Sequence, residues 1–244
     1  MKNQSSQFIA FCAFALASIP SQAFSAALVV PNFSFESPDV ADGATSDTAT
    51  SWAAARVGGS PSPIVIDPTG TQFSGAGGNN GTLPGTANGG QTGVAQLFGS
   101  AGEGRALFSG TIATIQASTT YTLTVAVGQS AQPTVELVRI DLRSSDGFTS
   151  SASITGAQLP GGSFSDLSTS FTTAATGDAR VGHGLSVQLN HIAQSATGTT
   201  HFAYFDNVRI EATTAPEPST GLLTAVGLVC TLLHRRRTTN EYIR

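Results

Sequence analysis

The segment Tyr121-Thr122-Leu123-Thr124-Val125-Ala126-Val127 decides the fold class of this chain of 244 residues. Apolar side chains alternate with threonines at its start, so that Tyr121, Leu123 and every second residue to Val127 lie on one face of an extended strand. A strand with one apolar face buries that face against a second layer. The segment therefore predicts a β-strand in the core of a layered β-protein.

Other strand-like segments follow one another between turn residues, and none of them has sustained helical periodicity. They are Leu28–Val30, Ser51–Ala53, Pro63–Ile66, Val94–Phe98, Ala106–Ile112, Val135–Leu142, Ser168–Thr172, Leu185–Leu189 and Phe202–Ile210. Between them, the stretch Ser74–Gly93 is rich in glycine and asparagine, which predicts a surface loop. The pattern predicts an all-β fold, with a single β-sandwich domain over residues 28–212.

The composition limits the partners of this domain. Charged residues make up 11% of the chain, against about a quarter in average proteins. Between Leu28 and Ala212, six arginines and thirteen acidic residues give a net charge of −7. This charge repels phosphate backbones, so we expect no nucleic-acid partner. The two cysteines, Cys12 and Cys230, lie outside the domain, which excludes a disulfide framework, a zinc knuckle or a thiol nucleophile within it.

Residues 1–27 have the features of a signal peptide. Lys2 gives the positive start, Phe8–Ala17 is the apolar run, and Pro20 precedes a stretch of small residues. Cleavage after Ser25 or Ala27 satisfies the preference for small residues before the cut. We therefore expect the chain to be exported.

The C-terminal segment, residues 213–244, has three parts in a fixed order. They are the tripeptide Pro216-Glu217-Pro218, the apolar run Gly221–Leu233 and the basic cluster Arg235-Arg236-Arg237. As a helix, the thirteen residues of the apolar run span about 20 Å, against about 30 Å of bilayer hydrocarbon. The basic cluster favours the cytoplasmic side. These parts predict a short hydrophobic helix that inserts into the membrane only transiently.

This order of parts resembles the PEP-CTERM sorting signal of Gram-negative bacteria, from Pro216 to Arg237. The resemblance implies recognition by exosortase, an integral-membrane transpeptidase-like protease, together with the secretion machinery. It also implies transient anchoring in the inner membrane, followed by transfer to the cell surface or the extracellular matrix. The polar extension of residues 238–244 departs from the family pattern, and a plain tail anchor is the alternative.

Two segments of the domain resemble galactose-binding-like jelly rolls, a group that includes many carbohydrate-binding modules. Val30–Glu36 looks like their Asn-x-Ser-Phe-Glu opening, and Phe205–Ile210 looks like the closing strand that carries Phe-Asp-Asn-Val. Thr119–Leu123 is similar to their middle strand. The resemblance implies that the sandwich is a jelly roll.

The same resemblance implies a structural calcium beside the first and last strands. Glu36 and Asp206 would supply carboxylates, and Asn32 or a nearby carbonyl would complete the hard-oxygen set that calcium prefers. The alternative is that Glu36 and Asp206 only accept backbone hydrogen bonds that close the sandwich.

Linear catalytic motifs are missing: there is no His-Glu-x-x-His, no Gly-x-Ser-x-Gly and no phosphate-binding loop. His183, His191 and His201, the histidines of the domain, are interpreted as structural or surface residues, and Trp52 as a core residue. We therefore predict that the chain is not an enzyme but an exported surface or matrix protein whose domain binds exopolysaccharide or is simply embedded in it. The alternative is a secreted hydrolase that acts on polysaccharide.

Overall fold

The structure of the chain is a computed structural model that describes residues 23–57, 64–73, 90–98, 100, 102–131, 135–194 and 199–215. Residues 1–22 of the predicted signal peptide lie outside these ranges. So do the predicted sorting motif, the apolar helix and the arginine cluster. The chain divides into two compact units, and one of them, Ser25–Thr213, contains nearly all of the described residues.

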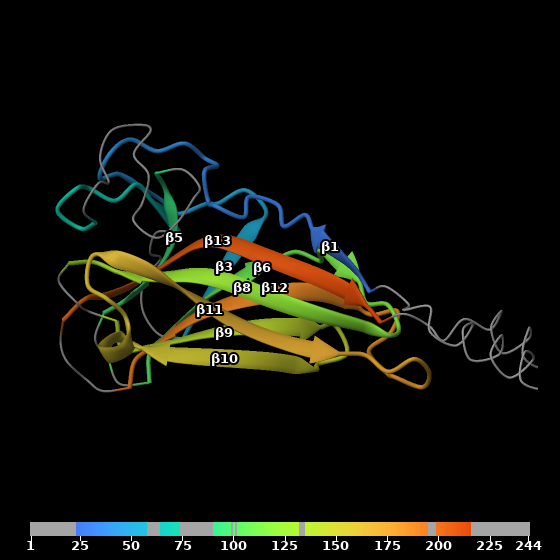
Figure 1. The fold of residues 1–244 in the computed structure, drawn as a ribbon. Helices are drawn as coiled ribbons and strands as arrows, with labels where there is room; N and C mark the ends of the chain where they lie inside the picture. The colour runs from blue at the N-terminus through green and yellow to red at the C-terminus, as the bar shows by residue number, and fades with distance from the viewer. Residues whose placement is uncertain are drawn as a thin grey trace, which may run out of the picture. The chain divides into compact units, whose positions relative to one another are not determined.

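The described residues form two antiparallel sheets that face each other, which confirms the predicted all-β sandwich (Figure 1). The strands of the first sheet are β1 (Phe24–Leu28), β2 (Thr45–Ser46), β4 (Val65–Ile66), β5 (Thr92–Leu97), β8 (Thr119–Gln129), β11 (Ser163–Thr172) and β13 (His201–Thr214). They lie in the order β11-β8-β13-β5-β4-β2, and β1 pairs with β13.

The strands of the second sheet are β3 (Trp52–Val57), β6 (Gly104–Ser109), β7 (Ala113–Thr114), β9 (Leu137–Ser144), β10 (Thr149–Thr155) and β12 (Gly184–Ile192). They lie in the order β10-β9-β12-β6-β3, and β7 pairs with β12. A 3-10 turn, η1 (Gly156–Gln158), follows β10. Because strand neighbours in both sheets come from distant parts of the sequence, each sheet brings together residues that no local pattern connects.

The alternation in β8 builds the main core as predicted. Tyr121, Leu123, Val125 and Val127 are all buried between the sheets, where they join a large apolar cluster. Thr122 and the other intervening threonine point the opposite way and are only partly buried. Because successive side chains of a strand point to opposite faces, this alternation places one face of β8 in the core.

A second apolar cluster lies on the outer face of the first sheet, the face turned away from the second sheet. We call it the outer aromatic cluster. It comprises Ile66, Phe73, Val94, Ala126, Phe164 and Tyr204, with Phe202 packed against it. In Figure 1 the segments 29–50 and 64–73 gather over the end of the sandwich near β5. Phe73 comes from the second of these segments and is fully buried. The sequence did not predict this outer layer, because the loop that closes it is not periodic.

Several strands differ from the sequence-based expectation, among them β2, β5, whose first residues Thr92 and Gly93 fall in the predicted loop, β10 and β1. β10 was not predicted, because Thr149–Thr155 is rich in serine and threonine and has little apolar alternation. Its pairing with β9 on one side supplies the backbone hydrogen bonds that its side chains do not predict. β1 begins at Phe24, within the segment assigned to the signal peptide, and pairs with β13. The cleavage boundary itself stays a prediction. Over the described ranges, no helix has the length and apolar character needed to cross a membrane.

Candidate functional site

The predicted calcium ligand Asn32 holds its own loop together. Its Nδ2 donates to the carbonyls of Ser37 (2.8 Å) and Thr50 (3.1 Å), and its Oδ1 accepts the N–H of Ser37 (3.1 Å). The Asn32 carbonyl accepts the indole N–H of Trp52 at 3.1 Å. Trp52 is buried, as predicted for a core residue. Both ends of the Asn32 amide therefore serve the turn at the start of the domain.

Glu36 and Asp206, the two predicted carboxylate ligands, lie on adjoining segments. The carbonyl of Phe33 accepts the N–H of Val208 at 2.8 Å, which lays the first loop along β13. Glu36 Oε1 accepts the N–H of Gln91 at 3.1 Å, and burial raises the pKa of the Glu36 carboxyl. Within the described ranges, no group of three or more His, Cys, Asp or Glu residues is arranged to hold a metal ion. A calcium site at this place stays a prediction.

A bulge in β13 carries Asp206. Phe205 and Val208 both pack in the core between the sheets, although residues three apart on a regular strand point to opposite faces. Asn207 has a φ of 48°, in the left-handed region, which is where the extra residue of a bulge is accommodated. Asp206 is fully buried, and its Oδ1 accepts the N–H of Asn207 at 2.6 Å. Alternation up to the bulge places Asp206 on the same outer face as Tyr204, two residues earlier.

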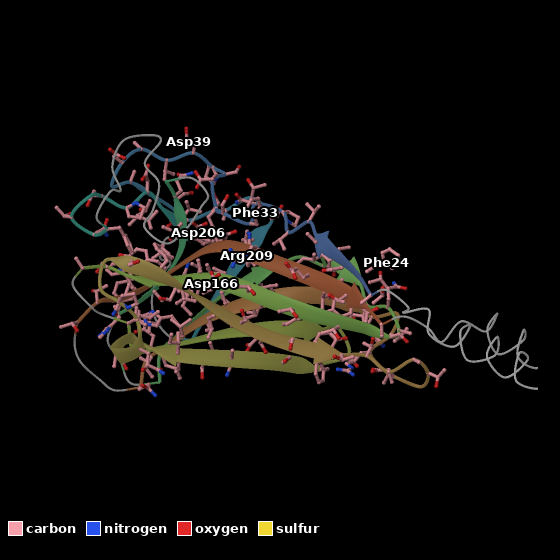
Figure 2. The ribbon with its side chains drawn as sticks, viewed as in Figure 1. Phe24, Phe33, Asp39, Asp166, Asp206 and Arg209 are labelled. Atoms are coloured by element: carbon pink, nitrogen blue, oxygen red, sulfur yellow. The ribbon has the colours of Figure 1, made fainter. Side chains whose placement is uncertain are left out.

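Figure 2 shows Asp206 and Arg209 along β13, with Phe33 above the strand and Asp166 on β11. Arg209 Nη2 and Asp166 Oδ2 are 2.6 Å apart, in an ion pair whose side chains are 40% and 53% exposed. Asp206 is instead withdrawn from solvent. The outer face therefore holds two carboxylates in opposite surroundings, one exposed and paired with arginine, the other fully buried two residues after Tyr204.

The outer aromatic cluster lies on the same face and includes Tyr204. The ring of Phe73 stacks on that of Phe164, with centroids 4.8 Å apart and an angle of 26°, and meets Tyr204 edge-on at 4.9 Å and 87°. Gln72 Nε2 donates to the Tyr204 hydroxyl at 3.3 Å. Burial raises the pKa of Tyr204 to about 12, so its hydroxyl stays protonated at all physiological pH values. The cluster thus presents flat apolar surfaces and one neutral hydroxyl.

Gly128 allows Phe164 to lie flat against β8. The two residues pair directly across β11 and β8. A Cβ on Gly128 would stand 2.6 Å from the Phe164 ring, closer than carbon atoms approach. The absence of a side chain at Gly128 therefore shapes the floor of the outer aromatic cluster.

At one end of the sandwich, the structure gathers titratable side chains that the sequence leaves far apart. His191, on β12, is fully buried and lies opposite Arg105 of β6 in the strand register. His191 Nε2 accepts the N–H of Glu136 at 3.4 Å. Glu136 Oε1 in turn lies 3.6 Å from His201 Nε2, on β13. His183 is not part of this group, because its Nδ1 lies 3.2 Å from the hydroxyl of Ser145 instead.

The surroundings of His191 agree with its interpretation as a structural residue. Burial lowers the pKa of His191 to about 4, with nearby His201 acting in the same direction, so the ring is neutral at pH 7. Its two nitrogens have one donor role and one acceptor role, which suits a neutral imidazole. No sequence signal connects positions 136, 191 and 201, because only the strand order makes them neighbours.

A second acidic region lies in the loops near Glu36. Asp67 is 3% exposed, and its carbonyl and N–H bind the backbone of Gly43 and Ala44. Burial, and then the negative charges of Asp42 and Asp39, raise the pKa of Asp67 to about 6. This carboxylate is therefore ionised at pH 7 against an unfavourable local field.

Comparison with known proteins identifies the family of the domain. Residues 26–211 match the family model described as HpiC1-like, HpiC1 cyclase. The match extends from β1 to β13, so it includes Asp206 and the whole outer aromatic cluster. No curated protein matches the chain.

Two solved cyclase structures share this fold. The Stig cyclase Fisc from Fischerella sp. TAU, in complex with (3Z)-3-(1-methyl-2-pyrrolidinylidene)-3H-indole, superposes with a TM-score of 0.62. It is 20% identical, over 79% of this chain and 100% of that chain. A cyclase from the same organism in complex with 4-(1H-indol-3-yl)butan-2-one gives 0.53 at 19% identity, with 79% and 100% covered. The carbohydrate-binding module TmCBM61, in complex with β-1,4-galactotriose, gives 0.43 at 10% identity over 75% of this chain and 97% of that one.

The family match corrects the functional prediction. The prediction of a non-catalytic surface protein is wrong, and so is the statement that the chain is not an enzyme, because the matching family is one of cyclases. The family match likewise favours a cyclase over the alternative prediction, a hydrolase that acts on polysaccharide. The absence of linear catalytic motifs does not indicate a non-catalytic protein, since the candidate site is assembled from single residues on separate strands.

Proposed function

Because the chain belongs to the HpiC1-like cyclase family, we propose that it is a cyclase that closes a ring in a small aromatic substrate on the outer face of the first sheet. Asp206 acts as the proton donor, and the outer aromatic cluster provides the surface for the substrate. The observation that carries this proposal is the complete burial of Asp206 two residues from Tyr204.

Ring closure without oxidation conserves the atoms of the substrate, so it needs a proton delivered at one atom and removed at another. A carboxyl group held away from water supplies such a proton within reach of an apolar ligand. Aromatic surfaces complement this role, because their faces stack against a flat ligand and attract positive charge that develops during closure. The neutral Tyr204 hydroxyl adds a hydrogen-bonding group at the same place.

The ligands in the solved cyclase structures support an indole-type substrate. Both relatives from Fischerella sp. TAU hold an indole compound. A planar ring of that kind matches the stacked and edge-on contacts that Phe73 makes with Phe164 and Tyr204. Substrates of this class therefore make up the first panel to test.

The test is conversion of indoles that carry an alkenyl chain, followed by chromatography and mass spectrometry. A cyclised product has the mass of its substrate but a different retention time. Asp206→Asn is expected to lower the rate at least about 100-fold, as loss of a general acid does. Asp166→Asn, which changes the exposed carboxylate on the same face, is the control and should leave the rate nearly unchanged. Equal rates in wild type and Asp206→Asn would refute proton donation by Asp206.

The proposal includes export and sorting of the cyclase. The predicted signal peptide of residues 1–27 and the order of the motif, apolar run and arginines in the tail support it. Processing by exosortase would leave the enzyme at the cell surface or in the extracellular matrix of a Gram-negative bacterium, and contact with exopolysaccharide there stays a prediction. Mass spectrometry of the secreted protein should find an N-terminus near Ala26 to Leu28 and no peptide beyond Pro218. Recovery of residues 235–244 from secreted protein would contradict sorting.

Structural calcium, implied by the jelly-roll resemblance, is a competing role for Asp206. The adjoining segments that carry Glu36 and Asp206, and the hard carboxylate oxygens of these two residues, support it. The amide of Asn32 is already committed to backbone groups, so nearby carbonyls would have to complete the set. A carboxylate that coordinates calcium does not carry a proton, which makes the two roles of Asp206 separable by experiment.

A further inference from the structure

Phe73 occupies the centre of the outer aromatic cluster with its own ring. It is fully buried, stacked on Phe164 and edge-on to Tyr204. Four other buried members of the cluster come from the sheet itself: Val94 on β5, Ala126 on β8, Phe164 on β11 and Tyr204 on β13. The ring of Phe73 thus comes from a loop. The surface that receives it, which we call the seat, is formed by Val94, Ala126, Phe164 and Tyr204 on four neighbouring strands.

The loop that carries Phe73 has an internal fold of its own. The N–H groups of Gln72 and Phe73 both donate to the carbonyl of Thr69, at 2.9 and 3.2 Å. Gln72 Oε1 accepts the N–H of Thr69 at 2.9 Å. These bonds persist if the turn moves as a unit, because both partners belong to it.

The turn is attached to the sheet by few hydrogen bonds and by the apolar packing of Phe73. The N–H of Ala131 donates to the carbonyl of Gln72 at 2.8 Å, and Gln72 Nε2 reaches the Tyr204 hydroxyl at 3.3 Å, which is long for a hydrogen bond. Across the described ranges, these hydrogen bonds and the apolar packing of Phe73 attach the turn to the first sheet. Removing the ring from its seat breaks few polar contacts.

From this arrangement we infer that Phe73 holds the place of the substrate ring, and that an indole-type ring binds by displacing it from the seat on Phe164 and Tyr204. This inference rests on the proposed function, whose substrate site it specifies. An indole ring in the seat would gain the same stacking and edge-on contacts. Its N–H would donate to the Tyr204 hydroxyl, which accepts from Gln72 Nε2 in the free protein.

Displacement has a thermodynamic signature. A ligand that binds only the form with Phe73 out of the seat has an apparent Kd that is raised by the rarity of that form. If the open form is about 10% populated or less, removal of the ring lowers the apparent Kd about 10-fold or more. A residue that merely lines the seat has the opposite effect, because its removal deletes contacts with the ligand.

The experiment measures binding of 4-(1H-indol-3-yl)butan-2-one to the full chain by titration calorimetry. Phe73→Ala is expected to bind this probe at least about 10-fold more tightly than wild type. Phe171→Ala is the matched control, since Phe171 is also buried and also contacts two rings, those of Tyr121 and Phe148, within the main core. It should leave the affinity unchanged. Equal or weaker binding by Phe73→Ala overturns the inference.

A second measurement separates displacement from filling of an artificial cavity. In wild type, the probe should accelerate chymotrypsin cleavage after Phe73, because binding exposes a ring that is otherwise buried. Cleavage that is unchanged or slowed at saturating probe overturns displacement. If Phe73→Ala does not fold, Gln72→Leu replaces it. That variant removes the contact with Tyr204 and also the bond from the Thr69 N–H to Gln72 Oε1 within the turn, so the turn holds the ring less firmly. Binding should tighten several-fold, and unchanged binding again overturns the inference.

The outcomes also distinguish this inference from the proposed function. If Phe73→Ala binds the probe more tightly and Asp206→Asn keeps the wild-type turnover, displacement of Phe73 is supported and proton donation by Asp206 is refuted. Loss of turnover in Asp206→Asn without any effect of Phe73→Ala supports the cyclase and refutes displacement.

Discussion

The imidazole of His191 ties the two sheets together: its Nδ1 lies 2.8 Å from the carbonyl oxygen of Ala95, so a strand of the second sheet donates to a strand of the first. The partner is a carbonyl, which requires the proton on Nδ1. Nε2 then accepts from the backbone of Glu136. A single neutral side chain in the core therefore satisfies backbone groups on two other segments.

Acid is expected to destabilise the domain through His191. Burial lowers its pKa from 6.5 to about 4, so the unfolded chain binds more protons than the folded one between these values. The stabilising contribution is complete above pH 6.5 and is lost as the pH falls through 4. It amounts to roughly 3 kcal/mol at most. Urea unfolding at pH 7 and at pH 4.5 measures the difference.

Variants assign this effect to His191. His191→Asn is expected to be less stable than wild type at pH 7, because it cannot bridge Ala95 and Glu136 with the same reach, and to lose much of the pH dependence. His183→Asn, at an exposed position, is the control. If the free energy of unfolding of His191→Asn still changes with pH as in wild type, a group other than His191 is responsible for the pH dependence.

Asp67→Asn is expected to stabilise the domain at pH 8 and to have little effect at pH 4. The pKa of Asp67 is raised from 3.8 to about 6 by burial and by Asp42 and Asp39. An acid with a raised pKa makes the folded state less stable as the pH rises from 3.8 through 6, because the unfolded chain ionises more readily. Asparagine removes that charge. Melting temperatures of both proteins at the two pH values test this, with the exposed Asp47→Asn as the control. A variant that is less stable at pH 8 would instead point to a favourable partner for the carboxylate.

Gly128→Ala is expected to destabilise the domain by about 1–3 kcal/mol, because its Cβ would stand 2.6 Å from the Phe164 ring and force it off the sheet. Gly104→Ala is the control, since nothing lies within 4 Å of a Cβ there. Chemical denaturation compares the two. The same substitution at Gly128 should also weaken binding of the indole probe, whereas equal stability of both variants would show that the ring of Phe164 has room to shift.

The two roles weighed for Asp206 differ in their response to chelation. With Asp206 as proton donor, Asp206→Asn lowers the rate of ring closure at least about 100-fold, and EGTA changes the melting temperatures of variant and wild type by the same amount. Thermal unfolding with and without EGTA provides the comparison, and Glu36→Gln tests the second carboxylate. A chelation effect that is present in wild type and absent in both variants would assign calcium, rather than a proton, to Asp206.

The sequence alone was sufficient for the class of fold. Alternation in Tyr121–Val127 is a local property of a pleated strand, and it identified a core face that the structure confirms. Most other strands were found for the same reason. β10 was missed because its side chains are mostly polar and its partner strand, not its own pattern, holds it in place.

The candidate site depended on tertiary structure. Asp206 was singled out from the sequence, but as a calcium ligand in a non-catalytic protein. Its complete burial, and the membership of Tyr204 in a buried aromatic cluster on the same face, became clear only in the structure. Phe73 lies 131 residues before Tyr204, yet their rings are 4.9 Å apart. Alternation reports which face of a strand is apolar, since it depends only on backbone geometry. Which strands become neighbours, and which loop covers them, depends on packing of the whole chain, and so the sequence determined the sandwich while the tertiary structure decided where its chemistry is placed.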